Sequence, residues 1–181
     1  GPVPADARVH RVVADESLLQ IFVYRGGPMA RLGHNHVIAS RHLDGVVHLT
    51  DDAARTQFDV RFPVNELTVD EPALREAAGA DFPAEVPQPA RDGTRKNMLS
   101  AALLDASNHP DIRLRSFEVK PGADALDVGV EITIKGRASQ VRVPMRVERR
   151  AGALVARGEF PLRQSELGLE PFKVAMGTLV V

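Results

Sequence analysis

Alternation between polar and apolar side chains is the feature that most constrains what this chain can fold into. The segment Gln57-Phe58-Asp59-Val60-Arg61-Phe62 alternates without a fault, so its three apolar side chains share one face of a strand. The same period of two recurs in three later segments, at 126–134, 141–147 and 154–160. Because an amphipathic helix would repeat every 3.6 residues, this pattern predicts a mainly β fold.

Turn-forming residues separate the alternating segments. Pro121-Gly122, Gly136 and Gly152 each lie between two of them. Short strands that are joined by tight turns and apolar on one face favour an antiparallel sheet, closed as a barrel or packed as a sandwich. The length of 181 residues fits a single domain over 1–181, with residues 1–8 as a tag remnant or a flexible terminus.

Two segments break the alternation and predict short helices. The first is Pro72–Ala78, which follows the acidic pair Asp70-Glu71, and we expect these carboxylates to cap it. The second is Thr94–Ala106, in which apolar residues keep helical spacing. Residues 80–93 contain three prolines and are predicted to form a long irregular loop of the kind that often lines a site.

Composition excludes several classes of function. Lys and Arg total 23 against 24 Asp and Glu, and the net charge of −1 argues against a nucleic-acid partner and against a polybasic membrane patch. No apolar run approaches the roughly 20 residues of a transmembrane helix. Cysteine is absent, which excludes disulfides and thiol chemistry.

Motifs of the common enzyme classes are also missing from the sequence. It contains no Gly-x-Ser-x-Gly elbow, no His-Glu-x-x-His pair and no phosphate-binding loop. The acidic pairs Asp51-Asp52 and Asp70-Glu71 lie in turn and helix-start contexts, where capping accounts for them. The sequence therefore predicts a protein that is not an enzyme.

His34 and His36 form the sharpest local signal. On a strand, side chains at i and i+2 point the same way, so both imidazoles are able to face one metal ion or a haem iron. The alternative is a pair of hydrogen-bonded histidines at the rim of the sheet. A third ligand would have to be His42, His48, His109 or a carboxylate, and a bulge at Gly45 would break the register between these histidines.

Several short blocks, taken in their order, resemble the YceI-like family of bacterial proteins, in the branch with a Gly-His-x-His segment. The blocks are Gly33–Ile38, Arg95–Leu99, Asn108–Ser116, Ile134–Gly136 and Val141–Met145. The likeness runs from about Val13 to the end of the chain. It implies a lipocalin-like antiparallel barrel of about eight strands with two short helices, usually periplasmic, that encloses a polyisoprenoid or a quinone tail.

The composition of the inward faces agrees with this implication. Several residues expected to point inward are small, among them Val60, Ala156 and Gly158, which leaves room along the axis for a slender apolar ligand. The candidate ligand-binding residues are Phe58, Val60, Phe62, Leu99, Leu103, Phe117, Val128, Val130, Ile132, Ile134, Val141, Val143, Met145 and Phe172.

The favoured function is to carry or store a long apolar ligand, a polyisoprenoid lipid or a quinone-type molecule, in a periplasmic or secreted protein whose signal peptide has been removed. The alternative is a periplasmic metal- or haem-binding protein that uses His34 and His36. A third hypothesis is an interaction module with a fully packed core. The expected partner is the apolar small molecule, and a homodimer is left open.

Overall fold

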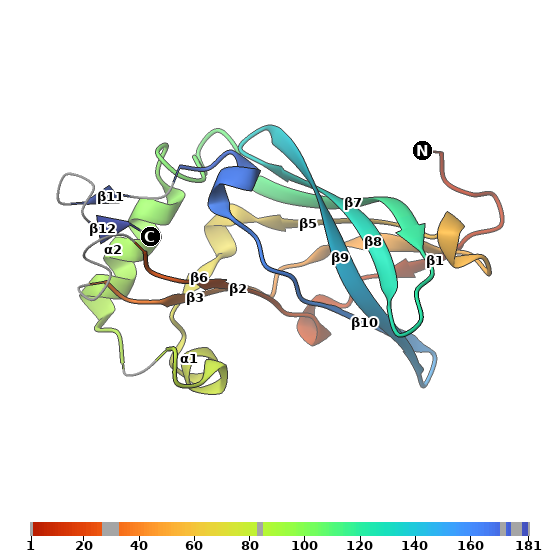
Figure 1. Ribbon diagram of the computed structural model, residues 1–181, viewed down its shortest axis with the longest axis horizontal. Coiled ribbons are helices and arrows are strands. Elements are labelled where there is room, and N and C mark those ends of the chain that lie inside the picture. Colours follow the sequence, from red (N-terminus) through yellow and green to blue (C-terminus); the bar gives the residue numbers. More distant parts are fainter. Residues whose placement is uncertain (1, 27–32, 83–84, 171–172, 175–178, 181) are drawn as a thin grey trace.

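A seven-stranded antiparallel sheet dominates the computed structural model, which describes residues 2–26, 33–82, 85–170, 173–174 and 179–180. The sheet curls along its width, as Figure 1 shows. Its strands follow the order β1-β4-β5-β7-β8-β9-β10. Their bounds are Arg8–Arg11 (β1), Asp44–Leu49 (β4), Gln57–Pro63 (β5), Asp111–Lys120 (β7), Leu126–Ile134 (β8), Arg137–Arg150 (β9) and Ala153–Gly158 (β10).

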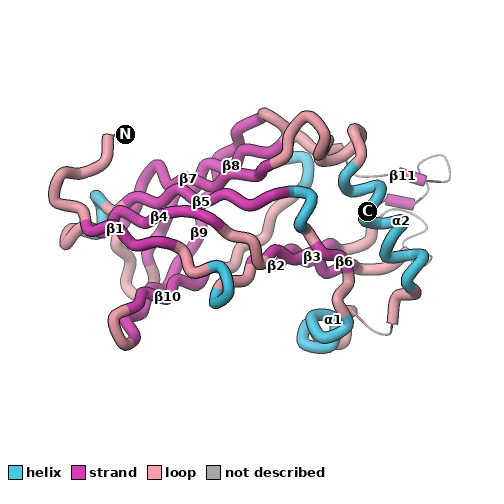
Figure 2. Tube along the Cα trace, turned by 180° about the vertical axis from the view of Figure 1, so that it is seen from behind, coloured by secondary structure: helices cyan, strands magenta, loops and turns pink. Residues whose placement is uncertain are grey.

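A second sheet of three short strands packs beside the first (Figure 2). It consists of β2 (Leu19–Val23), β3 (His36–Ser40) and β6 (Thr68–Val69), with β3 in the middle. The two-residue strands β11 (Lys173–Val174) and β12 (Leu179–Val180) pair with each other. The mainly β, antiparallel fold with two helices is thus confirmed, with the described strands divided between a curled half-barrel and a smaller sheet.

The strand register confirms which side chains share a face. Val47 pairs with Phe58, and Val60 pairs with Leu114. Directly paired residues point to the same side of a sheet, so these four lie together. Through the remaining pairs this side continues to β8, β9 and β10, and we call it the inner face because the second sheet and the longer helix pack against it.

Ion pairs cover the opposite, outer face. Arg115 contacts Glu131 at 2.9 Å, and Arg142 contacts Asp127 at 2.6 Å and Glu118 at 2.6 Å. Further pairs join Arg61 to Asp44 and Arg113 to Asp59. Each exposed pair contributes little to stability, typically about 0.2–1 kcal/mol. Together they fix this face as the one that meets water.

The first helix forms where the sequence predicts it, whereas the second is displaced toward the N-terminus. Helix α1 spans Pro72–Ala78, as expected, but α2 spans Gln88–Leu99, not Thr94–Ala106. A proline in the first turn leaves no helical hydrogen bond unmade, because the first amides of a helix have no partner within it. The predicted loop 80–93 is correspondingly shorter, and residues 100–107 form turns that bury Leu104 and Ala106.

Gly45 marks a close approach between two strands, and the predicted bulge is absent from the described residues around it. The pairing of β4 with β5 runs from Asp44 to His48 without a shift of register. A Cβ atom added at Gly45 would lie 2.3 Å from the backbone oxygen of Asp59. Only glycine lets the two backbones come this close.

Replacing Gly45 with Ala is expected to destabilise the protein by about 1–3 kcal/mol, because the two backbones would have to separate. Gly93, which lies in α2 with nothing within 4 Å of its would-be Cβ, is the control. Gly93→Ala should instead stabilise by about 0.5–1 kcal/mol through helix propensity. Urea unfolding of both variants measures the two free energies, and equal effects would refute the close approach at Gly45.

Candidate functional site

One end of the inner face is fully covered. Phe62, Ile112 and Ile132 are each at most 5% exposed, and they belong to a single apolar cluster that also contains Met98 of α2 and Ile38 of β3. Leu104, from the turns after α2, joins the same cluster. The second sheet and α2 therefore close this end as an ordinary packed core.

At the other end the same face is incompletely covered. There the inward residues of five strands are only half-buried: Val47, Leu49, Phe58, Leu126, Met145 and Leu154. Val147, which faces inward opposite Ala156, is 46% exposed. Because the strands are antiparallel, these residues lie near the same edge of the curled sheet, and we call that edge the open end.

The predicted ligand-binding residues mostly come together on the inner face. Phe62, Val128, Val130, Ile132, Ile134 and Val143 are buried in the apolar cluster, and Phe58, Val60, Leu99, Leu103, Val141 and Met145 are half-buried. Phe172 lies outside the described residues. The inward residues of β5 and β8, together with Val141, Val143, Met145 and Val147 of β9, thus form one apolar strip that runs from the core to the open end.

Phe117 is the exception among the predicted residues. It occupies a bulge in β7, where the register with β8 shifts between Ser116 and Glu118. Its ring lies over Gly129, whose would-be Cβ atom would approach it to 2.5 Å and would point to the outer face. The side chain is therefore on the outer face, away from the apolar strip, and half of it is exposed. An aromatic ring over a strand glycine shields the backbone that the glycine leaves bare.

A buried polar network joins the second sheet to α1. The carboxylate of Asp70 accepts hydrogen bonds from the backbone amide of Val37 at 2.9 Å and from Arg75 at 2.7 Å, and its other oxygen lies 2.7 Å from Nδ1 of His36. All three ionisable residues are at most 6% exposed. Asp70 also has a φ of 54°, a left-handed conformation that Asp tolerates better than most residues.

The network decides the charge state of the buried carboxylate. Burial alone raises the pKa of Asp70, but the hydrogen bonds from His36, Val37 and Arg75 outweigh it, and the net effect lowers the pKa. Asp70 is therefore ionised at neutral pH although water does not reach it. The Arg75 guanidinium needs this negative charge, because a buried cation without a counterion is strongly destabilising.

The expected capping role of Asp70-Glu71 is wrong. No side chain caps the first turn of α1. The Asp70 carboxylate is used by the network, and Glu71 binds Arg41 at 2.6 Å and Thr68, contacts that lower the pKa of Glu71. The local pattern of an acidic pair before a proline does not reveal this, because two of the partners of Asp70, His36 and Val37, lie more than 30 residues earlier in the chain.

The structure separates the histidines considered as metal ligands. His36 is buried and its Nδ1 is engaged with Asp70, whereas His34 is exposed with its ring centroid 6.3 Å from that of His36. His42 is exposed in the loop that joins β3 to β4, and His48 lies on the outer face of β4, so neither joins the pair. Among the described residues, no group of three or more His, Asp or Glu is placed to hold a metal ion. A metal or haem at His34 and His36 stays a prediction.

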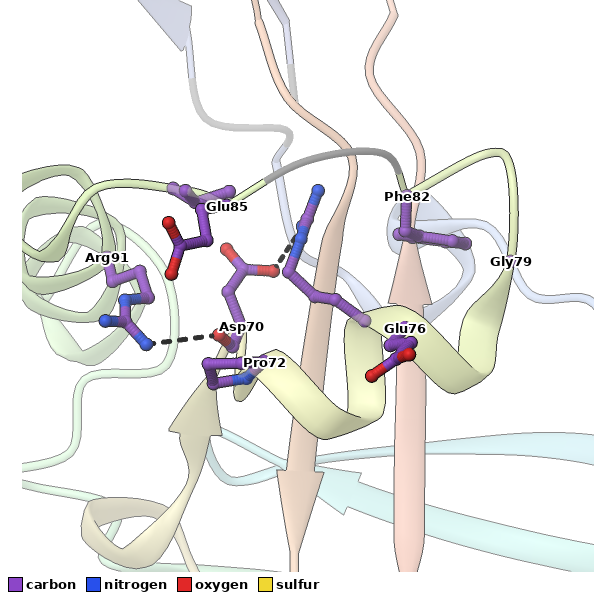
Figure 3. A pocket seen from close by; sticks show the side chains of 9 residues that line it. Asp70, Pro72, Glu76, Gly79, Phe82, Glu85 and Arg91 are labelled. Carbon is purple, nitrogen blue, oxygen red and sulfur yellow. Dashed lines mark hydrogen bonds and ion pairs between the residues drawn. The ribbon is translucent and has the colours of Figure 1, made fainter.

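A surface pocket of about 400 Å³ lies beside the polar network, between α1 and α2 (Figure 3). Asp70, Arg75, Glu85 and Arg91 line it together with Phe82, and Figure 3 shows Glu85 close to Arg91 and Phe82 farther away. Arg91 donates a 3.4 Å hydrogen bond to the backbone oxygen of Asp70. Its walls combine both signs of charge, which does not suit an apolar chain, and the pocket lies apart from the open end.

Comparisons with known proteins agree on the fold. A family model described as the YceI-like domain matches residues 29–180. A crystal structure of BcnA from Burkholderia cenocepacia is 18% identical, with a TM-score of 0.56 over 74% of this chain and 72% of that one. A YCEI protein of Campylobacter jejuni is 10% identical, with a TM-score of 0.51 over 70% of this chain and 67% of that one. No curated protein sequence matched.

The search for membrane-crossing helices had a negative result. Within the part of the chain that the structure describes, neither α1 nor α2 is long and apolar enough to cross a bilayer.

Asp70→Asn should destabilise the protein by about 3–5 kcal/mol, because it removes the buried negative charge that Arg75 and the amide of Val37 bind. The matched control is Asp59→Asn, which removes a carboxylate from the partly exposed pair with Arg113 and should cost about 0.2–1 kcal/mol. Urea unfolding at pH 7 measures both. Similar losses in the two variants would contradict the role assigned to the network.

The lowered pKa of Asp70 also predicts how the stability loss in Asp70→Asn depends on pH. The lowered pKa of Asp70 means that its contribution to stability is complete above the unfolded pKa of about 3.9 and is lost as the pH falls through the lower native pKa. The difference in unfolding free energy between the native chain and Asp70→Asn should therefore be full at pH 5 and shrink below about pH 4. A difference that grows on acidification would show that the carboxylate is not stabilised as described.

Proposed function

We propose that this chain, which belongs to the YceI-like family, binds one long apolar molecule against the inner face of its curled sheet and carries or stores it. The ligand class is a polyisoprenoid lipid or a quinone-type molecule. The apolar strip would hold the chain of the ligand, which would enter and leave at the open end.

The proposal rests on one observation: the apolar strip is buried at one end and partly exposed to solvent at the other. At one end its residues are buried under α2 and the second sheet. At the other end Val47, Leu49 and Val147 are not among the described residues that pack against the apolar cluster. An aliphatic surface left partly uncovered on the inside of a sheet loses the free energy that burial would yield. A slender apolar ligand is the partner that recovers it.

The chemistry of the strip predicts how such a ligand would be selected. Every inward residue of β5 and β8 is aliphatic or aromatic, so the strip offers a ligand chain no hydrogen bonds. Burial contributes about 25 cal/mol for each Å² of apolar area, which makes the affinity grow with ligand length. We therefore expect selection by length and cross-section, and weak discrimination between headgroups.

Family membership supports the same class of function. The YceI-like family is a family of ligand-binding proteins found in the periplasm, and the polyisoprenoids that it binds match the apolar strip in character. We accordingly place the chain in the periplasm and assign it no catalytic role. The likeness to the two solved structures supports the fold alone, since both are less than 25% identical.

Protein purified from its native compartment should release an isoprenoid lipid or a quinone when extracted with organic solvent and analysed by mass spectrometry. A visible absorbance spectrum of the same sample checks the alternative, because haem and bound copper are coloured. Extracts free of apolar molecules, from protein that takes up none on incubation with a polyprenol, would contradict the proposal.

Val141→Trp should greatly reduce the lipid recovered per protein, because Val141 is half-buried on the inner face and the indole would occupy the ligand's path. The control is Gln140→Trp, one residue away and on the outer face, which should leave lipid recovery unchanged. After delipidation, Val141→Trp should unfold at nearly the native midpoint, whereas an overpacked core would lose about 1–3 kcal/mol. Full lipid occupancy in Val141→Trp would place the ligand elsewhere.

A further inference from the structure

The hairpin of β9 and β10 carries a local excess of positive charge that the composition of the whole chain conceals. Residues 146–157 contain four arginines and a single acidic residue, Glu148, in a protein of net charge −1. The four arginines are Arg146, Arg149, Arg150 and Arg157, and all of them are exposed.

The ion pairing of this hairpin differs from that of the rest of the outer face. Glu148 is shared between Arg150 at 2.7 Å and Arg157 at 3.7 Å. Within the described ranges, neither Arg146, which faces outward, nor Arg149, which lies opposite Leu154 and faces inward, has an ion pair or hydrogen bond through its side chain. Arg146 also lies directly opposite Arg157 in the register, and like charges in that position are destabilising. The fold thus tolerates an electrostatic cost here that it avoids on neighbouring strands.

The shape of the hairpin presents this charge at the surface. Ala151 and Gly152 form a two-residue turn with positive φ at both positions, 43° and 85°, as in the tight type I′ turn. The turn projects from the end of the curled sheet in both views (Figures 1 and 2). It lies at the open end, where Val147, Leu154 and Arg149 face inward and Arg146 and Arg157 face outward.

We propose that the β9–β10 hairpin docks the protein on the surface of an anionic lipid bilayer, with the open end turned toward the membrane. This inference rests on the proposed function, because a ligand that is nearly insoluble in water has to be taken from a bilayer or returned to one. Arginine guanidinium groups bind phosphate oxygens of lipid headgroups well, and each basic residue near an anionic surface adds to the attraction.

A bilayer fits the hairpin better than a nucleic acid or an acidic protein does. The excess of arginine is local to the hairpin, whereas Arg61, Arg115 and Arg142 on the neighbouring strands pair with carboxylates and form no continuous basic track for a phosphodiester backbone. The exposed aliphatic side chain of Val147 beside Arg146 and Arg149 suits the boundary between headgroups and acyl chains.

The test is co-sedimentation of the delipidated full chain with phosphatidylcholine vesicles, with and without phosphatidylglycerol. The variant is Arg146→Gln with Arg149→Gln, which removes the two arginines without an ion-pair partner. The control is Arg61→Gln with Arg113→Gln, which removes two positive charges that are paired on the outer face. The two variants have the same net charge, so a difference between them reports position.

We expect the native chain to bind the anionic vesicles and to lose most of this binding in 1 M salt, where the Debye length falls to about 3 Å. The hairpin variant should bind about fivefold more weakly for each arginine removed, roughly 25-fold in all, and the control should bind nearly as the native chain does. Any of three results would overturn the proposal. Both variants could lose vesicle binding equally, the native chain could bind neutral vesicles as well as anionic ones, or it could bind an anionic polymer but not the vesicles.

Failure of the docking proposal and failure of the proposed function give different results. Vesicle binding by delipidated protein does not require a bound ligand. Native protein that contains lipid but does not bind anionic vesicles would overturn the docking alone. Selective vesicle binding by a protein from which no apolar molecule is recovered would overturn the proposed function and leave the docking supported.

Discussion

The buried carboxylate of Asp70 holds the second layer of this protein in place, and the covered part of the inner face depends on that layer. It accepts hydrogen bonds from the β3 backbone and from α1, and it contacts His36, so one side chain ties the two elements together. A buried ion pair gains little over an apolar pair of the same volume, but breaking one is costly. The network therefore acts less as a source of stability than as a geometric constraint, which sets where α1 and the second sheet lie.

The extent of that second layer decides what the inner face is able to do. Where β3, β6 and α2 pack on it, Phe62 and Ile132 are buried in a conventional core. Beyond their reach the face stays apolar but is only partly covered, up to Val147 at the open end. The seven-stranded sheet is larger than the area that three short strands and one helix are able to cover. The uncovered part of its inner face is the surface to which we assign an apolar ligand. Family membership and the likeness to a solved structure agree with the fold itself.

The outer face shows how charge is distributed over the same strands. Arg61 on β5, Arg113 and Arg115 on β7 and Arg142 on β9 are matched by carboxylates on neighbouring strands, which keeps this part of the face solvated without a net field. The β9–β10 hairpin departs from the rule, since Arg146 and Arg157 face each other across the strands. A net charge near zero thus describes an average over two different surfaces, and it does not by itself exclude a local basic patch.

The sequence by itself determined the four alternating strands β5, β8, β9 and β10, which of their side chains face inward, and the first helix, because alternation and a proline at a helix start are local effects that short-range geometry enforces. It did not determine the start of α2, where a local reading of the Pro-rich segment missed a helix that begins at Gln88. Nor did it show that the strands divide into two sheets, or that Asp70, His36 and Arg75 meet. The contact of Asp70 with His36 joins residues 34 apart, and only the packing of the chain selects it, since each residue had a plausible local role as a cap, a ligand or a surface charge.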